Sequence, residues 1–369
     1  MGKIKFISIY FKKLVKGELT MTKKINARVL KKIIEEILFK NGLSEEDSRI
    51  TSEVLINANL YGVDSHGISL IETYVNRIKE GGINSSPNRN VIKDSGCITI
   101  IDADGGMGPV SATLATQNAI KKAEGHGVGV VMVNNSNHIG MLAHYVNEIT
   151  KNEMIGIVLT NSGPNVAAWG GAEAVLGNNA LAVGIPVQNE AAFLLDMASG
   201  IVACGKVRMA ADKGIEKIPN DWILDKNGEK TDSPLDFLNG GVVLPFGQHK
   251  GYGIGMLIDF FTGVLSGGKF ATQVQRQRSD YSKISESSHT FIAINPELFI
   301  EKEELNKRVE EWLTIIKGSK KAFNVEEILI PGETEKNKFT TNVREGIEIT
   351  EKQLNVLKSL AEDYVFDLI

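Results

Sequence analysis

The sequence predicts a mixed α/β protein in which helices from both ends of the chain form one helical domain. Apolar residues near the N-terminus recur at three- to four-residue spacing, which is typical of amphipathic helices. After Pro87, short apolar runs alternate with helical segments, as expected for an α/β domain. The chain has 369 residues, which at about 150 residues per domain corresponds to two domains.

Three helices are expected in the first part of the chain. The first starts at Asn26, and the second runs from Ser44, whose side chain can cap the helix, to Leu60. The third begins beyond Ser65 and ends at the glycine pair 81–82, because glycine readily adopts the left-handed conformation that stops a helix.

The middle of the chain, residues 91–299, is expected to form the α/β domain. Its strands are predicted at 98–101, 128–133, 155–159, 180–185, 193–195 and 291–294, and its helices at 110–123, 140–150 and 252–265. Residues 212–240 are polar and irregular and contain the turn signal 225–228. Two late helices are predicted at 301–316 and 351–366. Terminal helices commonly pack together, so we expect residues 21–90 and about 300–369 to form the helical domain.

The composition argues against nucleic-acid, membrane and metal partners. Lys and Arg number 41 against 45 Asp and Glu, a formal net charge of -4 without a long basic run. No stretch approaches the ~18 apolar residues of a membrane span. Cys97 and Cys204 match no disulfide or metal framework, which favours a reducing, cytoplasmic location. A small-molecule substrate is therefore the expected partner.

The origin of residues 1–20 has two possible explanations. Their apolar run is interrupted by Lys12 and Lys13 and no small-residue cleavage site follows, which argues against a secretion signal. The codons for Lys16, Gly17 and Glu18 can form a purine-rich ribosome-binding sequence just before Met21. Two hypotheses stay open: translation from Met21, which would make residues 1–20 non-native, or a genuine basic amphipathic arm.

Two common nucleotide-binding motifs are absent from the sequence. The nearest match to the GxGxxG dinucleotide fingerprint, residues 251–255, has the wrong glycine spacing, so a Rossmann domain is not predicted. A P-loop-like run at 200–206 is followed by Val207 where a hydroxyl is needed to hold magnesium.

Two of the six histidines lie in polar segments suited to catalysis. His66 interrupts two predicted helices, and His138 follows the predicted strand 128–133, where α/β proteins place reactive groups. Taken alone, each is more often a structural histidine. His144 lies six residues after His138 and does not share the i,i+4 helix face of a zinc-binding pair, so no metal site is predicted.

Three further polar segments offer ligand contacts. Residues 160–164 provide short polar side chains after a strand, suited to ribose or amide groups. Asp196 ends an apolar strand, where a carboxylate is equally often a turn cap. Residues 245–253 lead into a helix whose free N–H groups, together with Lys250, can hold a phosphate; glycine flexibility alone would make this segment only a turn.

Six short motifs together resemble, in the same order, those of the type-2 malate/L-lactate dehydrogenase family. They are SHGI at 65–68, NHIG at 137–140, TNS at 160–162, WGG at 169–171, LDMA at 195–198 and HKGYG at 249–253. The resemblance covers essentially residues 22–350 of a family that includes ureidoglycolate, sulfolactate and 2,3-diketogulonate oxidoreductases. It implies a non-Rossmann nicotinamide-binding domain, a helical domain from both chain ends, and a homodimer with active sites near the domain and subunit interfaces.

The resemblance also assigns roles to residues. It implies His138 as the group that exchanges a proton with the substrate hydroxyl, because an ordinary histidine pKa of ~6.5 suits both reaction directions. It implies His66 as a second active-site histidine, either orienting the substrate or donating the proton itself. The implied cofactor contacts are Ser162, Asp196, Met197, Ala198, Lys250, Gly251, Gly332 and Glu333. The expected substrate-pocket residues are Ser65, Leu70 and Tyr74.

The chain departs from the family pattern at two positions. Many members carry an arginine four residues after the SHG histidine, able to hold a carboxylate through paired hydrogen bonds, whereas this chain has Leu70. Lys250 or Arg77 are candidates to replace that cation, or the substrate differs. In addition, Asn179–Ala180 replaces a commoner Asn-Pro pair.

The sequence therefore predicts an oxidoreductase that interconverts a small 2-hydroxy acid and its 2-oxo acid with NAD, NADP being the open alternative. Two other activities of the same class stay open: ureidoglycolate dehydrogenase, and a cyclic imino-acid reductase. An alternative of a different class is a non-catalytic nucleotide-binding protein, against which the presence of two active-site histidines argues.

Overall fold

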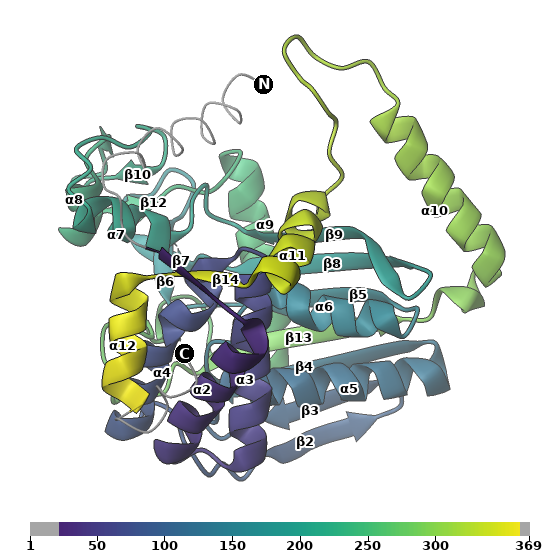
Figure 1. Ribbon diagram of the computed structural model, residues 1–369, viewed down its shortest axis with the longest axis horizontal. Coiled ribbons are helices and arrows are strands. Elements are labelled where there is room, and N and C mark those ends of the chain that lie inside the picture. Colours follow the sequence, from purple (N-terminus) through teal and green to yellow (C-terminus); the bar gives the residue numbers. More distant parts are fainter. Residues whose placement is uncertain (1–21, 362–369) are drawn as a thin grey trace.

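The computed structural model describes residues 22–361, and residues 1–21 and 362–369 lie outside this range. The fold contains most of the elements expected from the sequence, arranged as a helical part with a two-stranded sheet and two larger β-sheets (Figure 1). The hypotheses on residues 1–20 and the end of the helix expected at 351–366 fall outside the described residues. No helix within the described range combines the length and apolar character needed to cross a bilayer.

The helical part combines segments from both ends of the chain. Its elements are β1 (Thr22–Ile25), α2 (Ala27–Lys40), α3 (Glu45–Leu60), η2 (Asp64–His66), η3 (Ile68–Leu70), α4 (Ile71–Glu80), α11 (Glu333–Glu345), β14 (Ile347–Thr350) and α12 (Glu351–Ala361). The expected caps are confirmed: Ser44 Oγ accepts a hydrogen bond from Asp47 N at 3.1 Å, and Gly81 ends α4 with φ of 91°.

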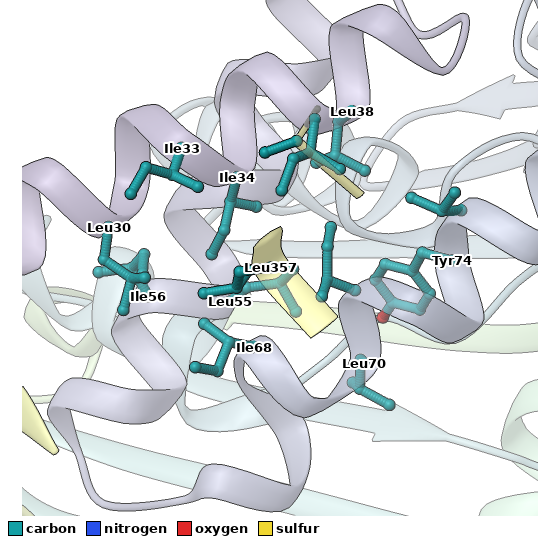
Figure 2. Packing of buried hydrophobic residues seen from close by; sticks show 14 of the residues in the cluster. Leu30, Ile33, Ile34, Leu38, Leu55, Ile56, Ile68, Leu70, Tyr74 and Leu357 are labelled. Atoms are coloured by element: carbon teal, nitrogen blue, oxygen red, sulfur yellow. The ribbon is translucent and has the colours of Figure 1, made fainter. Parts of the chain in front are cut away.

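The two chain ends share one apolar core. Figure 2 shows Leu357 of α12 among Leu30 and Ile34 of α2 and Leu55 of α3. The strands β1 and β14 also pair, with Thr22 opposite Thr350. The packing of the terminal helices α2 and α12 expected from the sequence is therefore present in the structure.

A seven-stranded mixed sheet forms the centre of the molecule. Its order is β2 (Asn90–Ser95), β3 (Ile98–Asp102), β4 (Val128–Ser136), β13 (Ser287–Ile294), β5 (Ile155–Thr160), β8 (Ala180–Val187) and β9 (Glu190–Ala198). Only the β3–β4 pair is parallel among these strands. This order differs from the parallel 3-2-1-4-5-6 order of a Rossmann sheet.

Two helices, α5 (Gly108–His126) and α6 (Leu142–Lys151), lie against one face of this sheet (Figure 1). Alanines at 112, 115, 119 and 123 of α5 are fully buried against the sheet. A Cβ at Gly129 of β4 would overlap the Ala119 carbonyl, so glycine is required there for the helix to approach this closely. The His138 loop leaves the end of β4 directly beside this packed layer.

A smaller five-stranded sheet lies in a segment that the sequence left mostly unassigned. Its strands, in order, are β11 (Lys230–Thr231), β10 (Ile223–Leu224), β12 (Val242–Val243), β6 (Pro164–Ala167) and β7 (Ala174–Gly177), with helices α7 (Cys204–Asp212) and α8 (Pro234–Leu238) nearby. The turn expected at 225–228 joins β10 to β11 and is closed by the Gly228 N–H bonding to the Asp225 carbonyl.

Two late helices differ in detail from the sequence prediction. The helix expected at 252–265 starts earlier, as α9 (His249–Asp259), and continues as a π-helical turn, η4 (Phe260–Val264). Short 3-10 turns follow at η5 (Ala271–Gln273) and η6 (Pro296–Leu298). The helix α10 (Lys302–Lys317) extends along the sheet (Figure 1), with the Trp312 ring 6.0 Å from that of Phe193 in β9, and contributes no residue to the helical core.

Candidate active site

The two histidines selected from the sequence lie side by side. His66 ends η2 between α3 and α4, and His138 follows β4, yet their ring centroids are 5.4 Å apart. Both side chains are half-buried, so each keeps one accessible side. The fold thus joins the helical part to the central sheet at this histidine pair.

Local packing fixes the segment that carries His66. Asn59 Oδ1 accepts a hydrogen bond from Ile68 N at 2.8 Å, and Asn59 Nδ2 donates to Asp64 Oδ1 at 2.8 Å. A Cβ at Gly67 would overlap the Asn59 amide, which explains the glycine after the histidine. Ser65 Oγ lies 3.0 Å from His66 Nδ1, so the Nδ1 side of the ring faces its own turn.

The ring of His138 is oriented through its Nδ1 atom. The Tyr74 hydroxyl lies 2.9 Å from Nδ1, and the Gly140 backbone nitrogen lies 3.2 Å from the same atom. Among the described residues, none forms a hydrogen bond with Nε2. Nε2 is therefore the ring atom of His138 that is available to a ligand.

The surroundings keep both rings neutral at ordinary pH. Burial lowers the pKa of His138 well below 6.5, and the charge of a protonated His66 and the permanent charges of Arg278 and Arg77 lower it further. Burial, followed by the charge of Arg278, lowers the pKa of His66 to about 4. A neutral imidazole can accept the proton of an alcohol, which is the requirement for a general base.

Asn137, directly before His138, is held from two sides. Arg77 Nη2 lies 3.0 Å from Asn137 Oδ1, and His289 Nε2 lies 3.2 Å from the Asn137 carbonyl oxygen. Thr160 Oγ1 is 2.7 Å from His289 Nδ1. Burial lowers the pKa of His289 to about 3, so its ring is neutral, and its Nε2–H donates to Asn137 while Nδ1 accepts from Thr160.

This contact brings the NHIG and TNS motifs together. Thr160 ends β5 two residues before Ser162, and His289 lies in β13 between β4 and β5. The completely buried His289 thus bridges the segment carrying His138 to the segment carrying Ser162. No role for His289 was predicted from the sequence, because its position in a buried strand follows only from the sheet order.

Asn179 forms hydrogen bonds with three of the segments expected to contact a cofactor. Its Oδ1 accepts from Ser162 N at 3.1 Å, its Nδ2 donates to the Gly255 carbonyl at 3.0 Å, and its own carbonyl accepts from Ser199 N at 2.7 Å. Asn179 is completely buried between these partners. Ser162, the strand end that precedes Ser199, and helix α9 are thereby fixed around one side chain.

Asp196, Met197 and Ala198 form the end of β9. Asp196 Oδ2 accepts a hydrogen bond from Ala143 N at the start of α6, at 2.8 Å. The carboxylate keeps solvent access, although protein atoms surround it on most sides and this desolvation raises its pKa to about 6. The side chains of Met197 and Ala198 are half-buried beside it.

The start of α9 leaves fewer free amides than the sequence suggested. The N–H groups of Lys250, Gly251 and Tyr252 donate to the carbonyls of Gly247, Phe246 and Gln248. A Cβ at Gly251 would overlap the Phe246 carbonyl, so this glycine is needed for the turn itself. The exposed ammonium group of Lys250 is therefore the feature of this segment best suited to an anion.

Gly332 and Glu333 lie at the start of α11, beside β9. The Pro331 carbonyl accepts from Leu194 N at 3.0 Å, and Gly332 has φ of 95° with no room for a Cβ against Leu194. The Glu333 carboxylate accepts from Ile330 N at 2.9 Å and pairs with Lys317 at 2.5 Å. Its oxygens are thus already engaged within the protein.

The three expected substrate-pocket residues occupy different environments. Ser65 is exposed beside His66, and Tyr74 is buried but directs its hydroxyl to His138. Leu70 is only 1% exposed and lies within the helical core (Figure 2). In the single chain, Leu70 thus presents almost no surface to a ligand.

Comparison with known proteins places this arrangement among dehydrogenases. A family profile described as malate/L-lactate dehydrogenase matches residues 25–358. A malate dehydrogenase from Pyrococcus abyssi is 38% identical, with 89% of this chain and 91% of the relative covered. An L-sulfolactate dehydrogenase from Methanocaldococcus jannaschii is 39% identical, with 91% and 97% covered.

A more distant relative and a solved structure extend the comparison. The ureidoglycolate dehydrogenase (NAD(+)) of Escherichia coli K12 is 33% identical, with 89% of this chain and 93% of the relative covered. The structure of the sulfolactate dehydrogenase from M. jannaschii superposes with a TM-score of 0.85 at 38% identity, covering 92% of this chain and 96% of the other. The similarity thus extends over the whole described fold.

Proposed function

Because the chain belongs to the malate/L-lactate dehydrogenase family, we propose that it interconverts a small 2-hydroxy acid and its 2-oxo acid with a nicotinamide cofactor. The observation that carries this proposal is the His66–His138 pair, in which Nε2 of the neutral His138 ring is available to a ligand. Malate and L-sulfolactate, named for two relatives, are the substrates of first choice.

The groups around Asn179 fit a nicotinamide dinucleotide in their chemistry. The Asp196 carboxylate and the Ser162 hydroxyl can bind hydroxyl or amide groups, and the exposed Lys250 ammonium suits a phosphate. We propose that these three residues form the cofactor site together with Met197 and Ala198 of the same strand end. Gly251, Gly332 and Glu333 support the surrounding backbone of this site. NAD is preferred over NADP because one relative carries NAD(+) in its name.

The bound cofactor supplies the hydride acceptor for oxidation and the hydride donor for reduction. His138 removes the hydroxyl proton at Nε2 during oxidation and returns a proton to the carbonyl oxygen during reduction. For this role Nδ1 carries the ring proton and donates it to the Tyr74 hydroxyl oxygen, whose own proton faces the His138 carbonyl oxygen 3.5 Å away, so that the lone pair on Nε2 is free to exchange a proton with the substrate. His66, adjacent to His138, orients the substrate oxygen.

The proposed activity is tested with the full chain, NADH or NADPH, and a panel of acids. Nicotinamide absorbance is followed with oxaloacetate, pyruvate, sulfopyruvate and cyclic imino acids, and in reverse with malate, L-lactate, L-sulfolactate and ureidoglycolate. Turnover of a 2-oxo acid is expected. Turnover confined to cyclic imino acids or ureidoglycolate would replace the proposed substrate class, and tight cofactor binding without any turnover would favour a binding protein.

The variant His138→Asn tests the assigned proton-transfer group. We expect kcat to fall about 10²- to 10⁴-fold, the usual contribution of general acid–base catalysis, with little change in cofactor affinity. His126→Asn is the matched control, because His126 is exposed at the end of α5 and should leave kcat unchanged. Near-normal turnover by His138→Asn would exclude its role.

We also propose a cytoplasmic homodimer. Six apolar residues of α9 and its continuation through Leu265 recur in pairs every four residues, and each is 38–55% exposed: Met256, Leu257, Phe260, Phe261, Val264 and Leu265. Such a continuous apolar stripe on a single chain is typical of an interface. Both cysteines, Cys97 and Cys204, are free thiols, in keeping with a reducing compartment.

A further inference from the structure

The proposed substrates are acids, and recognition of their carboxylate calls for a cation near the histidine pair. The position where many relatives are expected to supply an arginine holds the buried, apolar Leu70. The inference below rests on the proposed function and concerns which cation takes this role. Two arginines act electrostatically on His138, namely Arg77 and Arg278.

The guanidinium of Arg77 already forms hydrogen bonds within the protein. Its guanidinium is only 1% exposed, and its nitrogens lie within 2.7–3.3 Å of six oxygen acceptors. These are the carbonyls of Gln277, Asp280, Gly82 and Lys283, with Asn137 Oδ1 and Ser285 Oγ. A carboxylate would have to displace these contacts, so Arg77 is a positioning residue.

The contacts of Arg77 bring Arg278 beside the catalytic loop. One guanidinium binds both the Gln277 carbonyl at 3.0 Å and Asn137 Oδ1 at 3.0 Å. Gln277 directly precedes Arg278, just as Asn137 directly precedes His138. The segment from Gln277 to Ser285 is therefore fastened alongside the segment that carries His138.

The side chain of Arg278 remains available for a ligand. It is exposed, and no hydrogen bond or ion pair of its guanidinium occurs among residues 22–361. Its positive charge lowers the pKa of both His66 and His138 and also acts on Tyr74. The charge of Arg278 thus acts on the three side chains that define the proposed proton-transfer site.

We propose that Arg278 binds the carboxylate of the 2-hydroxy or 2-oxo acid and so determines the specificity of the site for acids. A guanidinium can form two parallel hydrogen bonds with a carboxylate, which fixes its orientation as well as its position. The Arg77 contacts hold the backbone of the segment in place before the substrate arrives. Leu70 is then a residue of the apolar core of the helical part.

The test compares the full-length protein with Arg278→Met and Arg278→Lys, using NADH with pyruvate and with its uncharged methyl ester. We expect Arg278→Met to raise KM for pyruvate about 10- to 100-fold, the usual effect of losing a charged hydrogen-bonding partner. KM for the ester should stay within about threefold, and Arg278→Lys should recover part of the loss because lysine keeps the charge but not the paired geometry.

A second readout follows from the charge of Arg278. Removing it should move the acidic limb of the pH profile to higher pH, since this charge lowers the pKa of the histidines. The matched control is Lys283→Met, which removes a positive charge from the same segment. The Lys283 side chain is exposed and pairs with Asp280 at 3.4 Å, so this variant should keep the parent KM and profile.

Failure of this inference is distinguishable from failure of the proposed function. If the parent protein turns over 2-oxo acids and Arg278→Met keeps its KM for pyruvate, Arg278 is not the carboxylate-binding residue, while the proposed function stands. If the parent turns over none of the acids, the proposed function fails. Calorimetric titration of the NADH-bound proteins with oxalate then decides the binding role: equal affinity in both overturns it, and weaker binding to Arg278→Met supports it.

Discussion

His138 shows how a half-buried ring can keep a single nitrogen available to a ligand. Its Nδ1 faces Tyr74 and Gly140, and burial makes the protonated ring unfavourable. The proposed base is therefore already deprotonated when the oxidation reaction begins. For reduction, the ring must first gain a proton, a step that the negative charge of a bound acid favours.

The lowered pKa of His138 gives a prediction for the pH dependence of the reaction. Since the neutral ring is the proposed base, kcat/KM for oxidation of the hydroxy acid should be constant above about pH 6.5 and fall only at lower pH. Initial rates at subsaturating substrate, measured across buffers of constant ionic strength, provide the test. An acidic limb centred at pH 7 or above would contradict the neutral, buried state of His138.

The two histidines proposed as catalytic were accessible to sequence reasoning because each lies in a short polar interruption with flanking glycine or serine. His289 and Asn179 carried no such signal. Each is fully buried, and their partners are distant in sequence: Asn137 and Thr160 for His289, Ser162 and Gly255 for Asn179. Their roles depend on strand order, which local residue patterns do not specify.

At the scale of elements, Asn179 joins the segments that follow β5 and β9 to the middle of α9. We predict that Asn179→Ala lowers the free energy of unfolding by about 1–3 kcal/mol, because the buried Ser162 amide and Gly255 carbonyl lose their partners. Cofactor affinity should fall about 10-fold as these segments shift. Denaturant unfolding and NADH fluorescence titration measure the two effects.

Asn147→Ala is the control for this prediction. Asn147 of α6 donates to the Tyr61 hydroxyl at 3.0 Å, away from the segments that Asn179 joins. The Asn147→Ala variant should lose a comparable hydrogen bond and keep the cofactor affinity of the parent protein. If both variants bind the cofactor like the parent protein, Asn179 has only a structural role.

The elements predicted well were those with strong local signals. Ser44 caps α3, Gly81 ends α4, and the predicted apolar runs 128–133 and 291–294 lie within β4 and β13. The short strands of the small sheet, two to four residues each, lack enough residues for a periodic pattern. The location of α10 could not be predicted from the sequence either, because its amphipathic pattern does not specify which surface the helix covers.

At the scale of the whole molecule, the apolar stripe of α9 and its continuation gives a prediction for assembly. We expect the parent protein to be a dimer and Phe260→Asp to be predominantly monomeric, because a charge within a buried apolar interface is unfavourable. Size-exclusion chromatography with light scattering measures the mass directly. Val91→Asp, at an exposed apolar residue of β2, should remain dimeric.

Two outcomes would contradict this assembly. A monomeric parent protein would show that the stripe does not serve self-association. A Phe260→Asp variant that remains a dimer would place the interface elsewhere on the surface. Circular dichroism of each variant separates loss of assembly from loss of folding.

The pairing of β1 with β14 also constrains how the protein is made. Thr22 pairs with Thr350, so β1, which is synthesised early, cannot pair until β14 has been synthesised near the end of translation. At about 5–20 residues per second, this wait lasts about 16–66 s on the ribosome. During that time, the apolar side of α2 lacks its α12 partner, Leu357. The central sheet has its strands available earlier, so vectorial synthesis favours a nascent chain whose middle folds before its beginning.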